Sequence, residues 1–197
     1  MFGFKKKQSA NESTGEVLSS EEIARLAGLR AENLFSAHGL SCSEANLLVL
    51  NHGFGGKLST ETVINLGSGF GGGVGDMGST CGALSGVVLG IGLYLGPGCD
   101  GGLGRKKFRA LIGKFLTDFK ETAGTVHCRE LIADFRKNRK ERSSFCGNLT
   151  GKCAEQAVRL LLLHRPELAA AADLEFLQGR DSRLKALVGR ILPGLVD

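Results

Sequence analysis

The six cysteines are the residues of this chain best suited to chemistry. They are Cys42, Cys81, Cys99, Cys128, Cys146 and Cys153. Cysteine thiolates attack disulfides, carry electrons as disulfide pairs and bind soft metals. The close CxxC pairs that are typical of zinc fingers are missing, because tens of residues separate most of these cysteines. The fold must therefore bring any working set of thiols together.

Four of the cysteines share one predicted setting, the first turn of a helix. These four are Cys42, Cys81, Cys128 and Cys153. Free backbone N–H groups and the helix dipole favour negative charge there, so we expect these thiols to have a lowered pKa. The sequence predicts that the four converge as redox-active groups and metal ligands. Cys99 and Cys146 are predicted in glycine-containing loops without an essential role, although Cys146 competes with Cys153 as the fourth member.

A glycine-rich segment, residues 67–78, precedes Cys81. We expect this segment to be a loop, because its many glycines have no side chains that could pack in a helix or strand. Backbone N–H groups in such a loop can approach an anion or the sulfur atoms of a cluster closely. The candidate glycines are Gly72, Gly73, Gly75 and Gly82. Residues 73–78 also spell GxGxxG, but no strand is predicted before them, so a dinucleotide site is not expected.

Helical periodicity and capping residues predict the elements that position these groups. Predicted helices cover about 19–37, 41–52, 59–66, 81–95, 108–124, 125–135 and 150–165, with a loop at 143–151. Pro166 opens another helix and Asp181 caps a last short one. No segment alternates long enough to be a strand. The prediction is an all-α helical bundle, with a disordered tail (1–18), a four-cysteine domain (19–165) and a C-terminal helical extension (166–197).

The helix beginning at Cys81 is apolar on every side, which predicts a place at the centre of the bundle. Gly82, Gly86 and Gly90 recur every four residues and form a flat strip on it. Each glycine costs about 1 kcal/mol of helix propensity relative to alanine, so we expect close packing to offset that cost. The expected partner is a helix of the same chain. A homodimer through other helices, such as the amphipathic one around residues 108–119, stays open.

Composition limits the classes of function. The chain has 197 residues with 42% apolar content, enough for a core that needs no metal to fold. The net charge of +5, with no Trp and one Tyr, is not typical of nucleic-acid binding. No apolar run is long enough to span a membrane and no secretory signal is evident. We expect a cytoplasmic protein. Thiols stay reduced in that compartment, so these cysteines are expected to serve as ligands or reactive groups.

The segment CGALSG, residues 81–86, matches a CGAxxG motif. It follows GFGGGVGDMG and an upstream Cys42 in the context CSEA, and it precedes HCREL around Cys128 and then Cys153. On these residues the chain resembles, over about 26–163, a family of four-cysteine redox-active proteins named for its C…GCAxxG…C…C pattern. The resemblance implies a redox role for clustered thiols. A similar domain occurs in split-Soret cytochromes, associated with an iron–sulfur centre; this chain has no CxxCH, so no haem is expected.

Four thiolates can hold a [2Fe–2S] or [4Fe–4S] cluster, or a closed tetrahedral zinc site. An iron–sulfur cluster for electron transfer with an unknown redox partner is our first expectation. A metal-free thiol/disulfide oxidoreductase is the second. A non-catalytic helical interaction module stabilised by zinc is the third.

Overall fold

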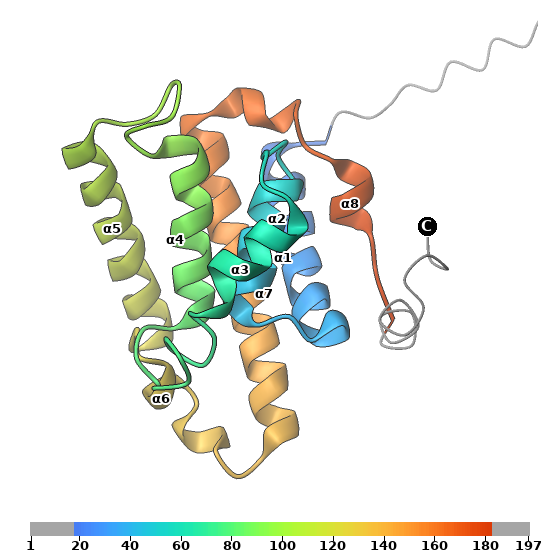
Figure 1. The fold of residues 1–197 in the computed structure, drawn as a ribbon, viewed down its shortest axis with the longest axis vertical. Coiled ribbons are helices and arrows are strands. Elements are labelled where there is room, and N and C mark those ends of the chain that lie inside the picture. Colours follow the sequence, from blue (N-terminus) through green and yellow to red (C-terminus); the bar gives the residue numbers. More distant parts are fainter. Residues whose placement is uncertain (1–17, 183–197) are drawn as a thin grey trace, which may run out of the picture.

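The computed structural model of the protein describes residues 18–182, and within them the chain is all-α, as predicted. The helices are α1 (Ser20–Asn33), α2 (Cys42–His52), α3 (Thr60–Ser68), α4 (Gly82–Leu95), α5 (Arg105–Ala123), α6 (Cys128–Leu131), α7 (Arg139–His164) and α8 (Leu174–Gln178) (Figure 1). Across these residues the only strand-like pairing is an isolated bridge between Thr80 and His127. The predicted tail, apart from Leu18, and most of the helix predicted after Asp181 lie outside the described residues.

Two capping boxes start α1 and α2 where the sequence predicts them. Ser19 accepts a hydrogen bond from the backbone N–H of Glu22, and the Glu22 carboxylate accepts one from the Ser19 backbone. Ser41 and Glu44 repeat this arrangement at α2. Each box satisfies backbone groups that the first helical turn leaves without partners. The second box sets the position of Cys42, which is the first residue of α2.

Helix α4 packs with its glycine strip against α2 of the same chain, as predicted. A Cβ atom added at Gly86 would lie 2.4 Å from the carbonyl oxygen of Ser43, and one added at Gly90 would lie 2.3 Å from the Leu50 side chain. No residue of α4 is exposed, and the Tyr94 hydroxyl donates a 2.7 Å hydrogen bond to the Leu50 carbonyl. The strip therefore brings two helix backbones close together in the core.

Helix α7 corrects the prediction of a loop at residues 143–151 followed by a new helix. It runs without a break from Arg139 to His164. Thr150 does not cap a helix, because its hydroxyl donates a 2.7 Å hydrogen bond to the carbonyl of Cys146 one turn earlier. A Cβ atom at Gly151 would lie 2.9 Å from the carbonyl oxygen of Gly28 on α1. Gly151, which the sequence suggests as a loop residue, is therefore a point of close contact between α7 and α1.

Helix α5 lies at the edge of the bundle beside α4 (Figure 1). It is amphipathic, as predicted, but none of its 19 residues is buried. Its apolar residues are only partly covered by the core; they include Phe108, Leu111, Ile112, Phe115 and Phe119. Among the helices described, none is both long and apolar enough to cross a membrane.

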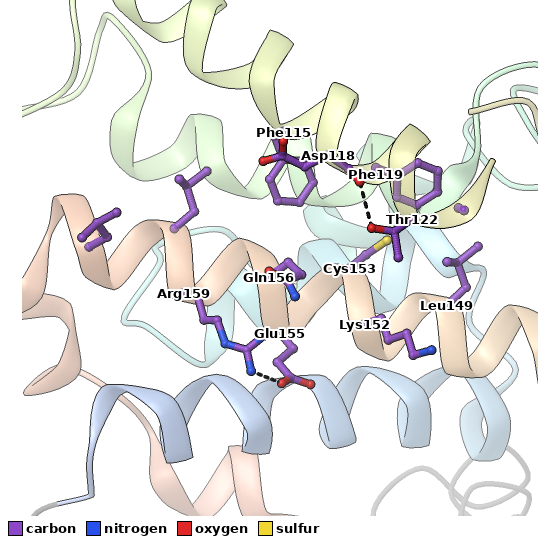
Figure 2. A pocket seen from close by; sticks show the side chains of 13 residues that line it. Phe115, Asp118, Phe119, Thr122, Leu149, Lys152, Cys153, Glu155, Gln156 and Arg159 are labelled. Atoms are coloured by element: carbon purple, nitrogen blue, oxygen red, sulfur yellow. Dashed lines mark hydrogen bonds and ion pairs between the residues drawn. The ribbon is translucent and has the colours of Figure 1, made fainter. Parts of the chain in front are cut away.

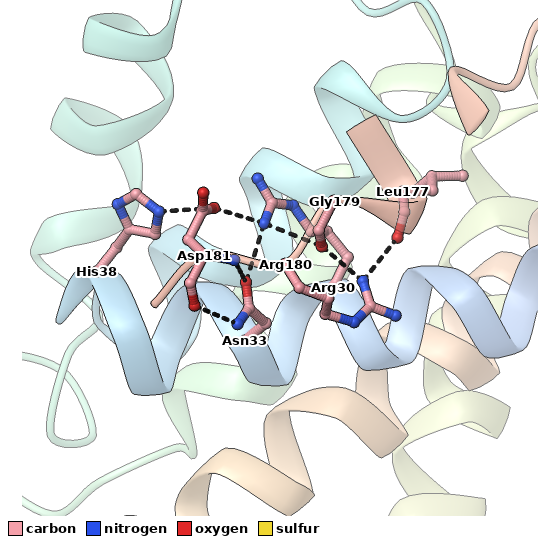
Figure 3. Close-up of polar contacts among 7 residues, drawn as sticks. All are labelled: Arg30, Asn33, His38, Leu177, Gly179, Arg180 and Asp181. Carbon is pink, nitrogen blue, oxygen red and sulfur yellow. Dashed lines mark hydrogen bonds and ion pairs between the residues drawn. The ribbon is translucent and has the colours of Figure 1, made fainter. Parts of the chain in front are cut away.

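The segment after α8 is fastened to α1 by charged groups (Figure 3). Arg30 is only 8% exposed and donates a 2.7 Å hydrogen bond to the Asp181 carboxylate. The His38 ring lies 2.8 Å from the same carboxylate, and the Arg30 guanidinium stacks on the Phe176 ring. These contacts hold the C-terminal segment of the described chain across one face of α1.

We expect this carboxylate to contribute a pH-dependent part of the stability. Burial raises the pKa of Asp181, but hydrogen bonds from His38 and Arg30 outweigh it and leave the pKa below its usual value. A lowered folded-state pKa stabilises the protein above about pH 4 and loses that contribution as the pH falls further. Asp181→Asn should cost roughly 1–3 kcal/mol at pH 7, because the buried Arg30 loses its charged partner.

Urea denaturation of the wild type and of Asp181→Asn at a series of pH values measures this effect. The difference between the two free energies of unfolding should shrink as the pH falls below about 4. A difference that stays constant from pH 7 to pH 3 would contradict the assignment.

Candidate functional site: a cavity lined by four thiols

Four cysteines line one small cavity of about 20 Å³. They are Cys42, Cys81, Cys128 and Cys146. The remaining walls are apolar side chains, namely Ala83, Leu131, Ile132, Phe145 and Leu149. Such a volume has room for about one water molecule. The four thiols come from α2, the start of α4, α6 and α7, so the tertiary structure brings together groups that lie far apart in the sequence.

Three of the four predicted site cysteines line this cavity, and the fourth cysteine that lines it is Cys146 rather than Cys153. Cys153 does not lie in a first helical turn, because it is in the interior of α7. Cys153 lies seven positions after Cys146, which is two helical turns and about 10 Å along the helix axis. Cys153 is 3% exposed and stays near the site, since the charges of Cys81 and Cys42 contribute to raising its pKa. Cys99 lies in the loop after α4, as predicted, and donates to the carbonyl of Leu93.

A short antiparallel pairing holds Cys81 beside Cys128. The Cys81 N–H donates to the Val126 carbonyl at 2.8 Å, and the Cys128 N–H donates to the Ser79 carbonyl at 2.7 Å. Cys81 is the N-cap residue of α4 and Cys128 is the first residue of α6. The pairing is too short to show as alternation in the sequence. It joins the two segments that bring Cys81 and Cys128 to the same cavity.

Two of the four predicted cofactor-binding glycines contact site cysteines. A Cβ atom at Gly82 would lie 2.6 Å from Cys42 Sγ, and one at Gly73 would lie 2.7 Å from Cys128 Cβ. Gly72 and Gly75 instead shape the loop, with φ values of +60° and +61°. These are left-handed conformations that favour glycine. Glycine at position 82 therefore leaves the space that the Cys42 thiol occupies.

We expect Gly82→Ala to disturb the cavity while leaving the rest of the bundle folded. The added methyl group would collide with Cys42 Sγ and with the carbonyl oxygen of Phe70, 2.8 Å away. Overpacking of this kind typically costs about 1–3 kcal/mol. Gly92→Ala on the same helix is the matched control, because its Cβ would meet only the Phe108 ring at an ordinary 3.9 Å.

Urea denaturation gives the stability of both variants, and titration with Ellman's reagent gives the number of reactive thiols. Gly82→Ala should be less stable and should show faster reaction at Cys42, while Gly92→Ala should match or exceed the wild type. Equal behaviour of the two variants would show that the close approach at Gly82 does not matter.

The predicted lowering of the thiol pKa values is wrong for the protein without metal. Burial raises the pKa of Cys42 to about 12, and repulsion from the other thiolates adds to this. Burial likewise raises the pKa of Cys146 to about 11. For Cys81, burial outweighs the backbone N–H groups of Leu84 and Ala83, which lower its pKa. The helix termini therefore act as predicted, but the loss of water around the sulfur atoms is the larger effect.

The donor chemistry of the cavity fits a soft metal or an iron–sulfur cluster. Thiolates are the ligands that both use, and apolar walls exclude competing water. In the packing of residues 18–182, no three His, Cys, Asp or Glu side chains are close enough to hold one metal ion. The cavity of about 20 Å³ is smaller than an iron–sulfur cluster, and apolar side chains such as Leu131 and Phe145 stand next to the thiols.

A second, wider groove of about 640 Å³ lies between α5 and α7 (Figure 2). Phe115 and Phe119 of α5 form one wall, and α7 contributes Cys153 and Gln156 to the other. Leu149 lines both the groove and the four-thiol cavity. Cys153 therefore belongs to the groove, and the two hollows are neighbours within the bundle.

One protein family matches the part of the chain that contains this whole site. A family model described as "Putative redox-active protein (C_GCAxxG_C_C)" matches residues 40–160, which include all four cavity cysteines and Cys153. No curated protein and no solved structure matches the chain. The family match spans more than half of the chain and agrees with the motif around Cys81. The chain therefore belongs to the C_GCAxxG_C_C family of redox-active proteins.

Proposed function

We propose that this redox protein binds an iron–sulfur cluster and transfers electrons to another protein. The proposed ligands are the four cavity cysteines: Cys42, Cys81, Cys128 and Cys146. One observation carries the proposal, namely that thiols from four separate segments line a single cavity whose other walls are apolar. A bound cluster would supply a one-electron carrier in a water-poor site.

The spacing of the thiols supports a cluster over a single zinc ion. A structural zinc holds four ligands about 2.3 Å from one point. The thiols of this cavity share a space but do not approach one point closely enough for that. A cluster spreads its four ligands around several metal atoms, so more widely spaced thiols suit it better. Within the wall, Gly82 and Gly73 leave the space next to Cys42 and Cys128 free of side chains.

The small volume of the cavity favours a second candidate, thiol/disulfide exchange without metal. Two adjacent thiols can form a disulfide without space for a bound metal or cluster. In that reaction two cavity thiols would form one disulfide, and a disulfide substrate would accept the two electrons and two protons to become two thiols. Cys81 and Cys128 form the candidate pair, because the two short segments that carry them are joined at the Thr80–His127 bridge by the hydrogen bonds from Cys81 N–H to Val126 and from Cys128 N–H to Ser79.

Anaerobic purification followed by spectroscopy and elemental analysis tests the proposal. We expect a coloured protein whose visible absorbance bleaches with dithionite, and iron and acid-labile sulfide in similar amounts per chain. Cys99→Ser is the control that should keep the colour. A colourless protein with stoichiometric zinc would contradict the proposal and favour a non-catalytic interaction module stabilised by zinc. A colourless, metal-free protein that loses two titratable thiols on mild oxidation would establish the second candidate.

A further inference from the structure

The glycine-rich loop presents two apolar side chains to solvent directly beside the four-thiol cavity. Met77 is 71% exposed and Val74 is 43% exposed. The loop is well held, since the Arg129 guanidinium donates a 2.7 Å hydrogen bond to the Met77 carbonyl and Gly78 N–H bonds to Gly72. These side chains are therefore displayed by an ordered backbone.

The backbone of this loop is strained at residues other than glycine. Val74 has a φ of +58° and Asp76 a φ of +60°. Positive φ is unfavourable for a β-branched residue, and neighbouring positions show that glycine is the usual choice in this segment. Strained backbone conformations are found most often at functional sites. Val74 remains 43% exposed in this conformation, which points to a role in contact with another molecule.

A set of cations surrounds the same end of the bundle, where the loop, α6 and the start of α7 meet (Figure 1). They are Arg129, Arg136, Lys137, Arg139, Lys140 and Arg142. Within residues 18–182 none of them belongs to an ion pair. Four carboxylates occur in the same segments, on Asp76, Glu130, Asp134 and Glu141, so the cations are in excess. The N-terminus of the long helix α7 adds further positive potential.

The loop also lies against one of the partly exposed thiols of the site. Cys42, Cys128 and Cys146 are partly exposed, whereas Cys81 is buried. The Cβ of Cys128 packs against Gly73 of the loop, and the charges of Arg142 and Asp76 both act on its thiol. A partner that docks on this end would therefore stand within one layer of side chains of the site.

We propose that the end face formed by Val74, Met77 and the six cations is the docking surface for an acidic electron-transfer protein. This inference rests on the proposed function and names the chemistry of its partner. The exposed apolar pair supplies the dehydrated centre of the contact and the cations supply the rim. Such an arrangement speeds encounter through charge and orients the partner over Cys128.

The first test measures the electrostatic field at Cys128 and does not require a cofactor. Metal-free protein is treated with an anionic (sulfonatoethyl) or a cationic (trimethylammonioethyl) methanethiosulfonate, and modification of Cys128 is followed by mass spectrometry. We expect the anionic reagent to react about three- to tenfold faster in 20 mM salt, with the ratio approaching one in about 0.5 M salt. The triple variant Arg136→Ser, Lys137→Ser, Lys140→Ser should abolish the preference. Removal of Lys106 and Lys107 on α5 is the control that should keep it.

The second test measures docking, with an acidic plant-type ferredoxin as the probe at low ionic strength. Met77→Ser and Val74→Gly should each weaken binding about fivefold or more. Val74→Gly should keep or raise the melting temperature, because glycine adopts positive φ without strain. Leu163→Ser, at a side chain 77% exposed elsewhere on α7, is the control that should bind normally.

The inference is overturned by equal rates of the two reagents at Cys128, or by normal ferredoxin binding in both loop variants. Tighter binding of a 20-base-pair DNA duplex than of ferredoxin through the same cations would also overturn it and would make the face a nucleic-acid surface. Both measurements stay informative if the protein proves colourless. Failure of the cluster and failure of the docking face are therefore distinguishable.

Discussion

Gly86→Leu is expected to lower the free energy of unfolding by about 3 kcal/mol or more, enough to unfold a marginally stable protein. A Cβ atom at position 86 would lie 2.4 Å from the carbonyl oxygen of Ser43 and 2.8 Å from its Cα. These are backbone atoms of α2, so no side-chain rotation relieves the collision. Helices α2 and α4 must separate to admit the leucine. Because Cys42 starts α2 and Cys81 caps α4, the four-thiol cavity must open as well.

The matched control is Gly113→Leu, the same change at an exposed glycine of α5 where an added Cβ meets nothing within 4 Å. It should be neutral or stabilising, since leucine has the better helix propensity by up to about 1 kcal/mol. Circular dichroism during heating measures both variants, with visible absorbance as a second signal. If Gly86→Leu melts within about 2 °C of the wild type, the α2–α4 contact is not the centre of the bundle.

Cys146→Ser is expected to abolish most of the bound cluster, whereas Cys153→Ser should keep it. Cys146 lines the cavity with Cys42, Cys81 and Cys128, and its loss would leave three thiols. Even weaker perturbations around metal ligands lower affinity about 10- to 100-fold, so removal of a ligand should do at least as much. Cys153 is buried in the wall of the neighbouring groove. Its replacement puts a hydroxyl in a buried place and should cost about 1–3 kcal/mol of stability without loss of colour.

Iron content, visible absorbance and urea denaturation of the two variants separate these effects. Cys146→Ser should be pale with a modest change in metal-free stability, and Cys153→Ser should be coloured but less stable. The reverse pattern would return the fourth ligand to Cys153. Loss of colour in both variants would mean that cluster binding depends on all five thiols, including Cys153 next to the cavity.

Local sequence patterns were sufficient to predict much of the fold. The capping boxes at Ser19 and Ser41 start α1 and α2, because a cap depends only on residues three positions apart. The apolar, glycine-striped segment after Cys81 is a buried helix packed closely on a neighbour of the same chain. The same patterns placed three cysteines at helix starts, and those three share the cavity.

Only the tertiary structure decided the fourth cavity thiol. Gly147 and Gly151 resemble loop residues in the sequence, and propensity alone favours a break between two helices. In the structure, contact with α1 and Phe35 offsets that cost, and α7 continues through them. The unbroken helix places Cys146 on the cavity and carries Cys153 two turns further. No local signal marks a glycine as a packing point, because the helix that it touches lies more than 100 residues away.

The tertiary structure also decided the direction of the thiol pKa shifts. The sequence correctly places Cys42 at a helix start, where the local effect is to lower the pKa. Burial depends on what the rest of the chain lays over the sulfur, and it raises the pKa of Cys42 to about 12. The pairing of the segments that carry Cys81 and Cys128 has the same origin, because backbone hydrogen bonds between residues 79–81 and 126–128 form only when the bundle closes. The sequence by itself determined which elements form, and the packing between them decided which thiols meet and how strongly they hold their protons.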